Sequence, residues 1–195
     1  MIYEAFAIIR SQLEDFIRSN SVIATTDPEV VLGNISLADT ADATSITNKV
    51  VISLVSLHEE QALKNGPTRF IEGDRIKKEN RPVHSNANIL ITAHYPANYA
   101  NALKRLGSVV SFFQGKNTFT LNNSPTAELE GVSDLQDFKM TLELVTPGFE
   151  ELNHIWGMMG GKSHPSVLYK ARILVIKRDA PQDFDTPITH ILINT

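Results

Sequence analysis

The sequence predicts an α+β domain in which helices pack on a mixed or mostly antiparallel sheet and long polar loops join the elements. Three segments show the three- and four-residue apolar spacing of helices, and four others show strand-like apolar runs or alternation. The two kinds of segment do not alternate strictly, as a parallel α/β sheet would require. With 195 residues, the chain has the length of one domain.

The first element is an amphipathic helix that runs from the N-terminus to Asn20, a residue typical of a helix end. Its apolar stripe consists of Ile2, Phe6, Ile9, Leu13, Phe16 and Ile17. Its polar face consists of Glu4, Arg10, Ser11, Glu14 and Arg18. Residues 21–48 are rich in Asp, Thr, Ser and Ala, so we expect a loop that carries one weak strand at the apolar island 30–32.

Two buried strands come next. Residues 50–57, VVISLVSL, are apolar on both faces, as in a central strand, and residues 87–95, ANILITAHY, form the second one. Residues 61–88 are polar and basic and contain too few large apolar side chains to join a core. This composition favours a mobile excursion.

A second helix follows Pro96 and ends at Gly115. We expect this helix and the other helices of the domain to pack on one face of the sheet. The apolar, buried side of this helix would present Tyr99, Leu103, Leu106, Val110 and Phe113. Residues 115–137 then form a second long polar excursion, with a short strand at 118–121.

The next strand and helix have the clearest pattern. Residues 138–145 alternate between apolar and polar side chains, which predicts a half-buried strand whose inward members are Phe138, Met140, Leu142 and Leu144. Thr146 is a suitable N-cap for the following helix, with Pro147 at its first position. That helix would have an apolar stripe of Phe149, Leu152, Ile155, Trp156 and Met159. Gly160 and Gly161 would end it.

Residues 166–178, SVLYKARILVIKR, form the longest predicted strand, and residues 188–193, ITHILI, add an edge strand. The strand at 138–145 returns through its short helix to the strand at 166–178, so these elements form a hairpin-like unit. We assign residues 1–195 to a single domain. Its core covers 1–178, and 179–195 form a C-terminal tail or edge strand.

Composition excludes several classes of protein. The chain has no cysteine, which removes thiol nucleophiles, disulfides and thiolate-ligated metals. Its first residues, MIYEAFAIIRSQLEDF, lack the basic start and unbroken apolar run of a signal peptide. No apolar segment approaches the roughly 18 residues of a membrane span. We therefore expect a soluble, cytoplasmic chain without a membrane span.

The charge balance argues against a nucleic-acid partner. The formal net charge is −4, whereas proteins that bind nucleic acid carry an excess of Lys and Arg. The basic run DRIKKENR, residues 74–81, has no interleaved aromatic side chains for base stacking. We interpret this run as a solvated loop. The alternative is that it becomes ordered against an acidic partner surface.

The stretch GMMGGKS, residues 157–163, has the composition of a phosphate-binding loop but not its spacing. In that loop the first glycine would stand at position 156, which is Trp156. A phosphate-binding loop also opens a helix, whereas these glycines close one. Lys162 lies near the helix C-terminus, where a cation is favoured. We interpret the stretch as a helix-ending turn.

The polar residues do not have the spacing of a catalytic or metal site. None of the histidines forms the helical i,i+4 pair with an intervening glutamate that binds zinc; they are His58, His84, His94, His154, His164 and His190. The chain has no Gly-x-Ser-x-Gly motif for a nucleophilic serine. Carboxylates distant in sequence could still be assembled into a dyad by the fold. We expect no enzymatic activity, no cofactor and no metal.

Three stretches of the sequence carry a resemblance to a known family. A short N-terminal helix precedes a hydrophobic strand, VVISLVSL, and a polar loop. ILITAHYPANYANALKRLGSVVSFFQ contains a Thr-Ala-aromatic turn and a Leu-Gly helix. LELVTPGFEELNHIWGMMGGKSHPSVLYKARILVI contains a short helix with Trp and a Ser-x-x-Tyr-Lys/Glu-x-Arg strand. Together these stretches, within residues 1–178, resemble the cap or tube-terminator proteins of contractile injection systems, which are phage-tail-like particles related to type VI secretion.

The resemblance implies a structural protein that forms a ring, a homohexamer, at the distal end of the inner tube. Its partners would be further copies of itself, the inner tube protein and the sheath protein. It would end tube polymerisation and anchor the last sheath ring, after assembly in the cytoplasm and without a cofactor. Some longer members of the family append a C-terminal domain, which we do not expect here. The expected structural core anchors are Thr92, Leu106, Trp156 and Tyr169.

The residues leave a second class of function open. A small soluble adaptor module would bind one unknown protein partner, alone or as a dimer, and would have no affinity for tubes. In a ring, by contrast, the sheet edge at 166–178 or 188–193 could pair with a neighbouring subunit. The polar excursions 61–88 and 115–137 could become ordered on such contacts.

Overall fold

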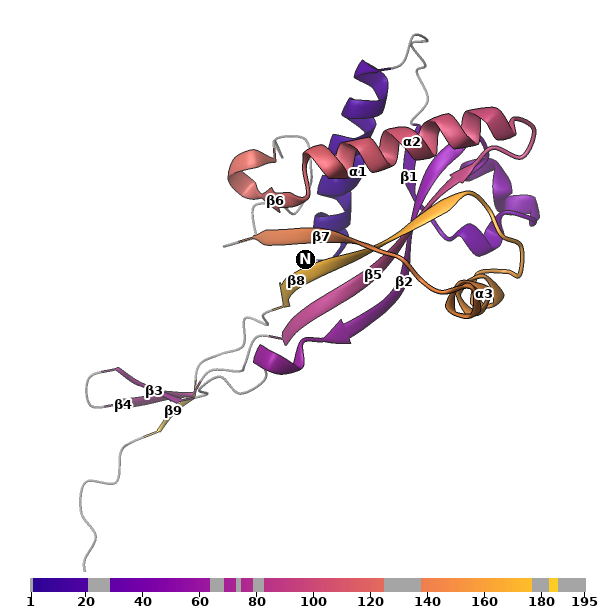
Figure 1. The fold of residues 1–195 in the computed structure, drawn as a ribbon. Coiled ribbons are helices and arrows are strands. Elements are labelled where there is room, and N and C mark those ends of the chain that lie inside the picture. Colours follow the sequence, from indigo (N-terminus) through magenta and orange to yellow (C-terminus); the bar gives the residue numbers. More distant parts are fainter. Residues whose placement is uncertain are drawn as a thin grey trace, which may run out of the picture.

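The computed structural model describes residues 2–20, 29–63, 69–72, 75–78, 83–124, 138–176 and 183–185. In these residues, three α-helices pack on a curled, mixed sheet of six strands, which confirms the predicted α+β class (Figure 1). The helices are α1 (Ile2–Ser19), α2 (Tyr99–Gly115) and α3 (Phe149–Met158). The strands, in spatial order, are β1 (Val30–Leu32), β2 (Lys49–Glu59), β5 (Val83–His94), β8 (Ser166–Ile176), β7 (Lys139–Val145) and β6 (Thr118–Thr120).

Strand β5 lies inside the sheet and pairs antiparallel with β2 along one edge and with β8 along the other. Strand β7 pairs antiparallel with β8, so the predicted hairpin-like unit is confirmed. β1 runs parallel to β2, which makes the sheet mixed. The longest strand is β5, with 12 residues against 11 in β8, so the expectation for 166–178 is wrong in this respect.

Helices cover both faces of the main sheet. Helices α1 and α2 pack on the face that presents Ile89 and Ile91 of β5. Helix α3, together with a 3₁₀ helix at Ile35–Leu37, packs on the opposite face over Leu90. Figure 1 shows α1 and α2 above the sheet and α3 below it. The expectation of helices on one face is therefore wrong for α3, because strands that are apolar on both faces need cover on both.

The carboxylate of Glu14 joins helix α1 to the edge of the sheet. Its oxygens accept hydrogen bonds from the backbone N–H of Glu29 (3.1 Å) and of Val30 (2.6 Å), where β1 begins. Arg18, one helical turn away, pairs with the same carboxylate, and Arg105 of α2 pairs with Glu29 at 2.6 Å. The expectation that Glu14 lies on the exposed face of the helix is wrong, because buried N–H groups at the start of β1 need an acceptor.

Helix α2 has the predicted span, and Phe113 and Leu106 pack inward as predicted, but the rest of its buried side differs from the prediction. Its buried side chains are Ala102, Val109, Phe112 and Phe113. Tyr99, Leu103 and Val110, which were expected in the core, are exposed. Apolar side chains occupy more than half of the circumference of α2, so its pattern alone does not select the buried side. The aromatic cluster selects it, because the ring of Phe113 packs 4.7 Å from that of Tyr169 on β8.

Helix α3 begins later than expected. Its N-cap is Gly148, whose N–H donates a hydrogen bond to Glu151 at 2.9 Å, so the cap predicted at Thr146 with Pro147 at the first position is wrong. Phe149 consequently occupies the first helical position and is 95% exposed instead of joining the apolar stripe. The other members of the predicted stripe pack on the core: Leu152, Ile155, Trp156 and Met159.

Strand β7 buries only part of its predicted apolar face. Phe138, Met140 and Leu142 lie in the cluster beneath α1 and α2. Leu144 alternates onto the same face but lies beyond that cluster and is exposed, which corrects its expected burial. The end of β7 next to α3 is therefore less covered than its middle.

A second, small sheet occupies part of the excursion predicted at 61–88. Strands β3 (Arg69–Glu72) and β4 (Arg75–Lys78) pair antiparallel, and β9 (Asp183–Asp185) pairs antiparallel with β4 (Figure 1). The interpretation of the basic run 74–81 as a loop is therefore wrong for the strand Arg75–Lys78, because strand pairing satisfies backbone groups without a large apolar content. The edge strand predicted at 188–193 and the excursion residues 125–137 lie outside the described residues.

The replacement Glu14→Gln should lower the free energy of unfolding by about 1–3 kcal/mol, since a neutral amide cannot keep the charge-assisted bonds to both N–H groups. The matched control is Asp15→Asn, the next residue of α1, which is exposed and should change stability by less than about 0.5 kcal/mol. Urea unfolding followed by circular dichroism measures both. Equal effects of the two replacements would contradict the anchoring role of Glu14.

Candidate interaction surfaces

The predicted core anchors do not converge on one site. Tyr169 lies in the apolar cluster beneath α1 and α2, whereas the buried Trp156 lies in the cluster beneath α3. Leu106 packs in a third, small cluster with Ala102 at the start of α2. Thr92 is buried within β5. The four residues contribute to separate parts of the packing.

The stretch GMMGGKS forms a helix-ending turn. Gly160 and Gly161 have φ angles of +103° and +83°, and the N–H of Gly161 donates to the carbonyl of Trp156 at 2.7 Å. Strand β8 follows, so no helix begins at this turn. Lys162 pairs with Asp39 at 2.9 Å and ties the turn to the segment beside the 3₁₀ helix at Ile35–Leu37. These contacts support the interpretation of a structural turn.

Two histidines that are distant in sequence meet beneath this turn. His94, at the end of β5, is 3% exposed, and its ring lies edge-on to that of His164 at 4.9 Å between centroids. The ring of His164 also lies 5.6 Å from that of Trp156. Burial lowers the pKa of both histidines; each pKa is partly raised again by the carboxylate of Asp39. The spacing of the histidines along the chain gives no signal of this pair.

The described residues contain no group of three or more histidines and carboxylates arranged to hold a metal ion. In the same residues, no helix is both long and apolar enough to pass through a membrane. The paired histidines face an indole ring and a salt-bridged turn. The two histidine rings therefore take part in the packing between the end of β5 and this turn.

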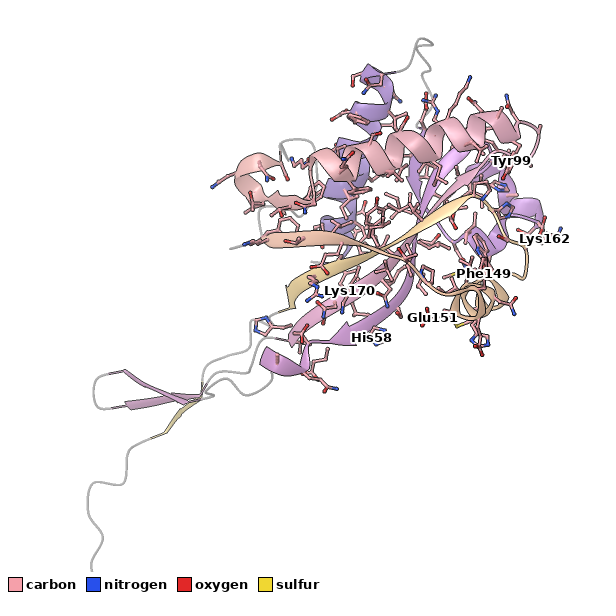
Figure 2. All side chains as sticks on the ribbon, in the orientation of Figure 1. His58, Tyr99, Phe149, Glu151, Lys162 and Lys170 are labelled. Atoms are coloured by element: carbon pink, nitrogen blue, oxygen red, sulfur yellow. The ribbon has the colours of Figure 1, made fainter. Side chains whose placement is uncertain are left out.

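The first surface suited to a protein partner is the outer side of helix α2. Tyr99, Leu103 and Val110 lie within one side of the helix, at spacings of four and seven residues, and all three are exposed. Tyr99, which is labelled in Figure 2, is 65% exposed. We call these three residues the α2 stripe. The same side includes Gly107, where a Cβ atom would meet no other atom within 4 Å. A partner could therefore approach the helix backbone closely there.

The second surface lies at the two ends of helix α3. Phe149 at the first position and Met158 at the last are both exposed, but they are nine residues apart and so point to opposite sides of the helix. Figure 2 labels Phe149. Glu150 and Glu151 lie beside Phe149 in the first turn, where the helix dipole favours negative charge. Helix α3 therefore exposes two large apolar groups and an acidic end.

The third surface is the part of the sheet that α3 leaves uncovered, and it is polar. Asn88 of β5 lies opposite Ser56 of β2 and Lys170 of β8, and Lys170 lies opposite Glu143 of β7. The amide of Asn88 donates to Ser56 at 3.0 Å, and Arg172 donates to Glu143 at 2.7 Å. One hydrogen bond joins β2 to β5 and the other joins β8 to β7, and Figure 2 shows Lys170 on this part of the sheet. Such a hydrogen-bonded row can contact a polar protein surface.

Comparisons with known proteins agree with the fold. The family model described as the Pvc16 N-terminal domain matches residues 5–190. A comparison with curated proteins finds no match. Among solved structures, one similar chain comes from a cryo-EM structure of the sheath/tube terminator of an extracellular contractile injection system, PVC, in its extended state. Another comes from the anti-feeding prophage cap, described as the AFP tube terminating cap.

The similarity to these two structures lies in the fold and covers part of their length. The sheath/tube terminator is 18% identical, with a TM-score of 0.55 over 100% of this chain and 63% of that chain. The tube terminating cap is 16% identical, with a TM-score of 0.50 over 96% of this chain and 60% of that chain. This chain thus spans less than two thirds of the length of each.

The buried histidine pair predicts a loss of stability on mild acidification. Because burial lowers the pKa of His94 and His164 in the folded state, the unfolded chain, with histidines near 6.5, takes up protons first as the pH falls. The free energy of unfolding should decrease from about pH 6.5 downwards. In urea unfolding at several pH values, His94→Gln should flatten this dependence, whereas His154→Gln, on the exposed side of α3, should leave it unchanged. An unaltered slope in His94→Gln would contradict this prediction.

The glycine turn predicts opposite effects of two similar replacements. Gly161→Ala should lower the free energy of unfolding by about 1–2 kcal/mol, because its positive φ disfavours a side chain. Gly157→Ala, inside α3, should raise it by up to about 1 kcal/mol through helix propensity. A Cβ atom at either position meets nothing within 4 Å, so sterics do not separate the two. Thermal unfolding measures the difference, and stabilisation by Gly161→Ala would refute the role of the turn.

Proposed function

Because the chain belongs to the Pvc16 N-terminal domain family, we propose that it is the cap, or terminator, of a contractile injection particle. In this proposal, copies of the chain form a ring of six at the distal end of the inner tube. The ring stops tube polymerisation and anchors the last sheath ring. The family match over residues 5–190 is the observation that carries the proposal. The similar folds of a sheath/tube terminator and a tube terminating cap support it.

The proposed role fits the shape of a tube end. A blunt tube end repeats the same protein surface around an axis, so a terminator with matching cyclic symmetry can engage every repeat at once. Weak individual contacts then add to strong binding, since each further contact forms at high effective concentration. Exposed apolar side chains and polar hydrogen-bonding groups, both present on the surface of this chain, are features of protein–protein contacts.

The proposal assigns residues 1–195 to one terminator-like domain, with its core over 1–178 and a tail or edge strand over 179–195. Its partners are further copies of the chain, the inner tube protein and the sheath protein. It involves no nucleic acid, no membrane span, no cofactor and no catalysis. Assembly takes place in the cytoplasm, where the particle is built. Thr92, Leu106, Trp156 and Tyr169 have structural roles in this proposal and touch no ligand.

Removal of the chain should leave tubes without a defined end. Particles from a strain that lacks this chain should show over-long or unfinished tubes in negative-stain images, because nothing halts the addition of tube subunits. Expression of the intact chain from a plasmid should restore the normal length distribution. A normal distribution in the deletion strain would contradict the proposed function.

A binding experiment separates the terminator from a small adaptor module. Purified chain mixed with tubes of the same particle should collect at tube ends as rings in electron micrographs. An adaptor would instead form a one-to-one or dimeric complex with another protein. A chain that stays monomeric and ignores tube ends at micromolar concentration would refute the terminator.

A further inference from the structure

Helix α3 is held on the sheet by far fewer buried side chains than helix α1. The structure describes both helices in full; α3 buries one side chain, that of Trp156, whereas α1 buries eight. The strands on either side of α3, β7 and β8, pair with each other, and β8 also pairs with β5. Helix α3 and the turn after it can therefore move away while the sheet keeps its pairing and its layer of α1 and α2 (Figure 1). We call residues 149–164 the α3 cover.

Aromatic contacts fix the C-terminal end of the α3 cover. Lys162 pairs with Asp39, but both side chains are more than half exposed, so solvent weakens this ion pair. The ring of His164 lies 5.6 Å from that of Trp156 and 4.9 Å from that of His94. The two imidazoles therefore link the one buried side chain of α3 to the end of β5.

The surroundings of His94 suit a neutral ring and disfavour a charged one. The residue is 3% exposed, and its Nδ1 is buried without a hydrogen-bond partner in the described part of the chain. A protonated imidazole carries a hydrogen on both nitrogens, so Nδ1 would need an acceptor that the packing does not supply. A second proton on His164 would place two positive rings in contact. The closed cover is therefore most stable when both rings are neutral.

The charged groups around the pair do not reverse this preference. The carboxylate of Asp39 favours protonation of both rings, but it already pairs with Lys162, whose charge opposes protonation of His164. Lys49 lies opposite His94 on β2 and adds no negative charge. The group that α3 contributes to the pair is an uncharged indole. Burial is the largest effect on both histidines, and it lowers the pKa of each.

We propose that the His94–His164 pair is a pH-sensitive latch, whose protonation releases the α3 cover from the sheet while α1 and α2 remain packed. Release uncovers the apolar side chains of Val51, Leu90 and Leu168, which pack in the cluster beneath α3. In the released state both rings are solvated and take up protons with a pKa near 6.5. Opening is therefore favoured as the pH falls below about 6.5. The inference is independent of the proposed function, since it concerns a single copy of the chain.

Hydrogen exchange read by mass spectrometry tests the latch in the unaltered chain. After correction for the intrinsic effect of pH, the amides of α3 should exchange about tenfold faster or more at pH 5.5 than at pH 7.5, because each histidine contributes up to about tenfold per pH unit below pH 6.5. The amides of α1 report on global unfolding in the same sample. They should have a larger opening free energy than those of α3 at both pH values.

The fluorescence of Trp156 gives a second readout, since it is the only tryptophan of the chain. Its emission should shift to longer wavelength between pH 7.5 and pH 5.5, because the indole leaves the apolar cluster and enters water. Far-UV circular dichroism should keep most of its helical signal over the same range, since α1 and α2 stay packed.

Replacement of the histidines tests whether these two rings form the latch. His94→Gln and His164→Gln should each reduce the pH dependence of the opening several-fold, because one titrating ring remains, and the double variant should abolish it. His154→Gln, on the exposed side of α3, is the matched control and should leave the response unchanged. Thermal unfolding at pH 7.5 establishes that each variant is folded. The exchange experiment on the unaltered chain needs no variant, so it decides the question where a replacement lowers stability too far.

Asp39→Asn separates the latch from a merely structural contact. Because Asp39 raises the pKa of both histidines, its removal should lower each pKa further in the closed state and make the pH dependence of opening steeper. Loss of the ion pair with Lys162 alone would instead favour opening equally at every pH.

Three results would overturn the latch. The first is an α3 exchange rate and a Trp156 emission that stay the same from pH 7.5 to pH 5.5. The second is a pH response that persists in the double histidine variant. The third is an equal opening free energy for α3 and α1 at pH 5.5, which would place the response in global unfolding. Each of these results would leave the terminator role standing.

Discussion

The structure depends on the apolar side chains that strand β5 presents on both of its faces. Because β5 is hydrogen-bonded along both edges, its faces can be buried only by helices packed above and below the sheet. Helices α1 and α2 supply one layer and α3 supplies the other. At the edge of the sheet, the carboxylate of Glu14 joins α1 to the backbone at the start of β1.

This arrangement leaves apolar side chains exposed on the outer side of α2 and at the two ends of α3. A ring needs different surfaces on one subunit, because a closed ring is built from head-to-tail contacts. The polar row around Asn88 and Lys170 occupies a third direction, on the uncovered part of the sheet. In the proposed terminator, this row is a candidate surface for contact with the tube or the sheath. A terminator needs separate surfaces of this kind, since it must contact its own copies and the tube end at once.

Most elements of the fold could be predicted, because apolar periodicity records whether a segment is a helix or a strand. Apolar periodicity could not predict the whole buried side of α2, since that helix is apolar over most of its circumference and the aromatic cluster of Phe112, Phe113 and Tyr169 selects the packed side. The late start of α3 depends on the cap that Glu151 forms, and this start exposes Phe149. The contact between the rings of His94 and His164 depends on how distant strands pair, which local sequence does not encode. The exposed surfaces were therefore found only in three dimensions.

The account's central claim is that copies of this chain close into a ring on the end of the inner tube. A cryo-EM reconstruction of particle ends tests this claim most directly. It should contain a closed ring of α+β domains on the last tube layer, each fitted by the six-stranded sheet with α2 and α3 on its two faces. Ends without this density, or a single copy of the domain located elsewhere on the particle, would contradict the account.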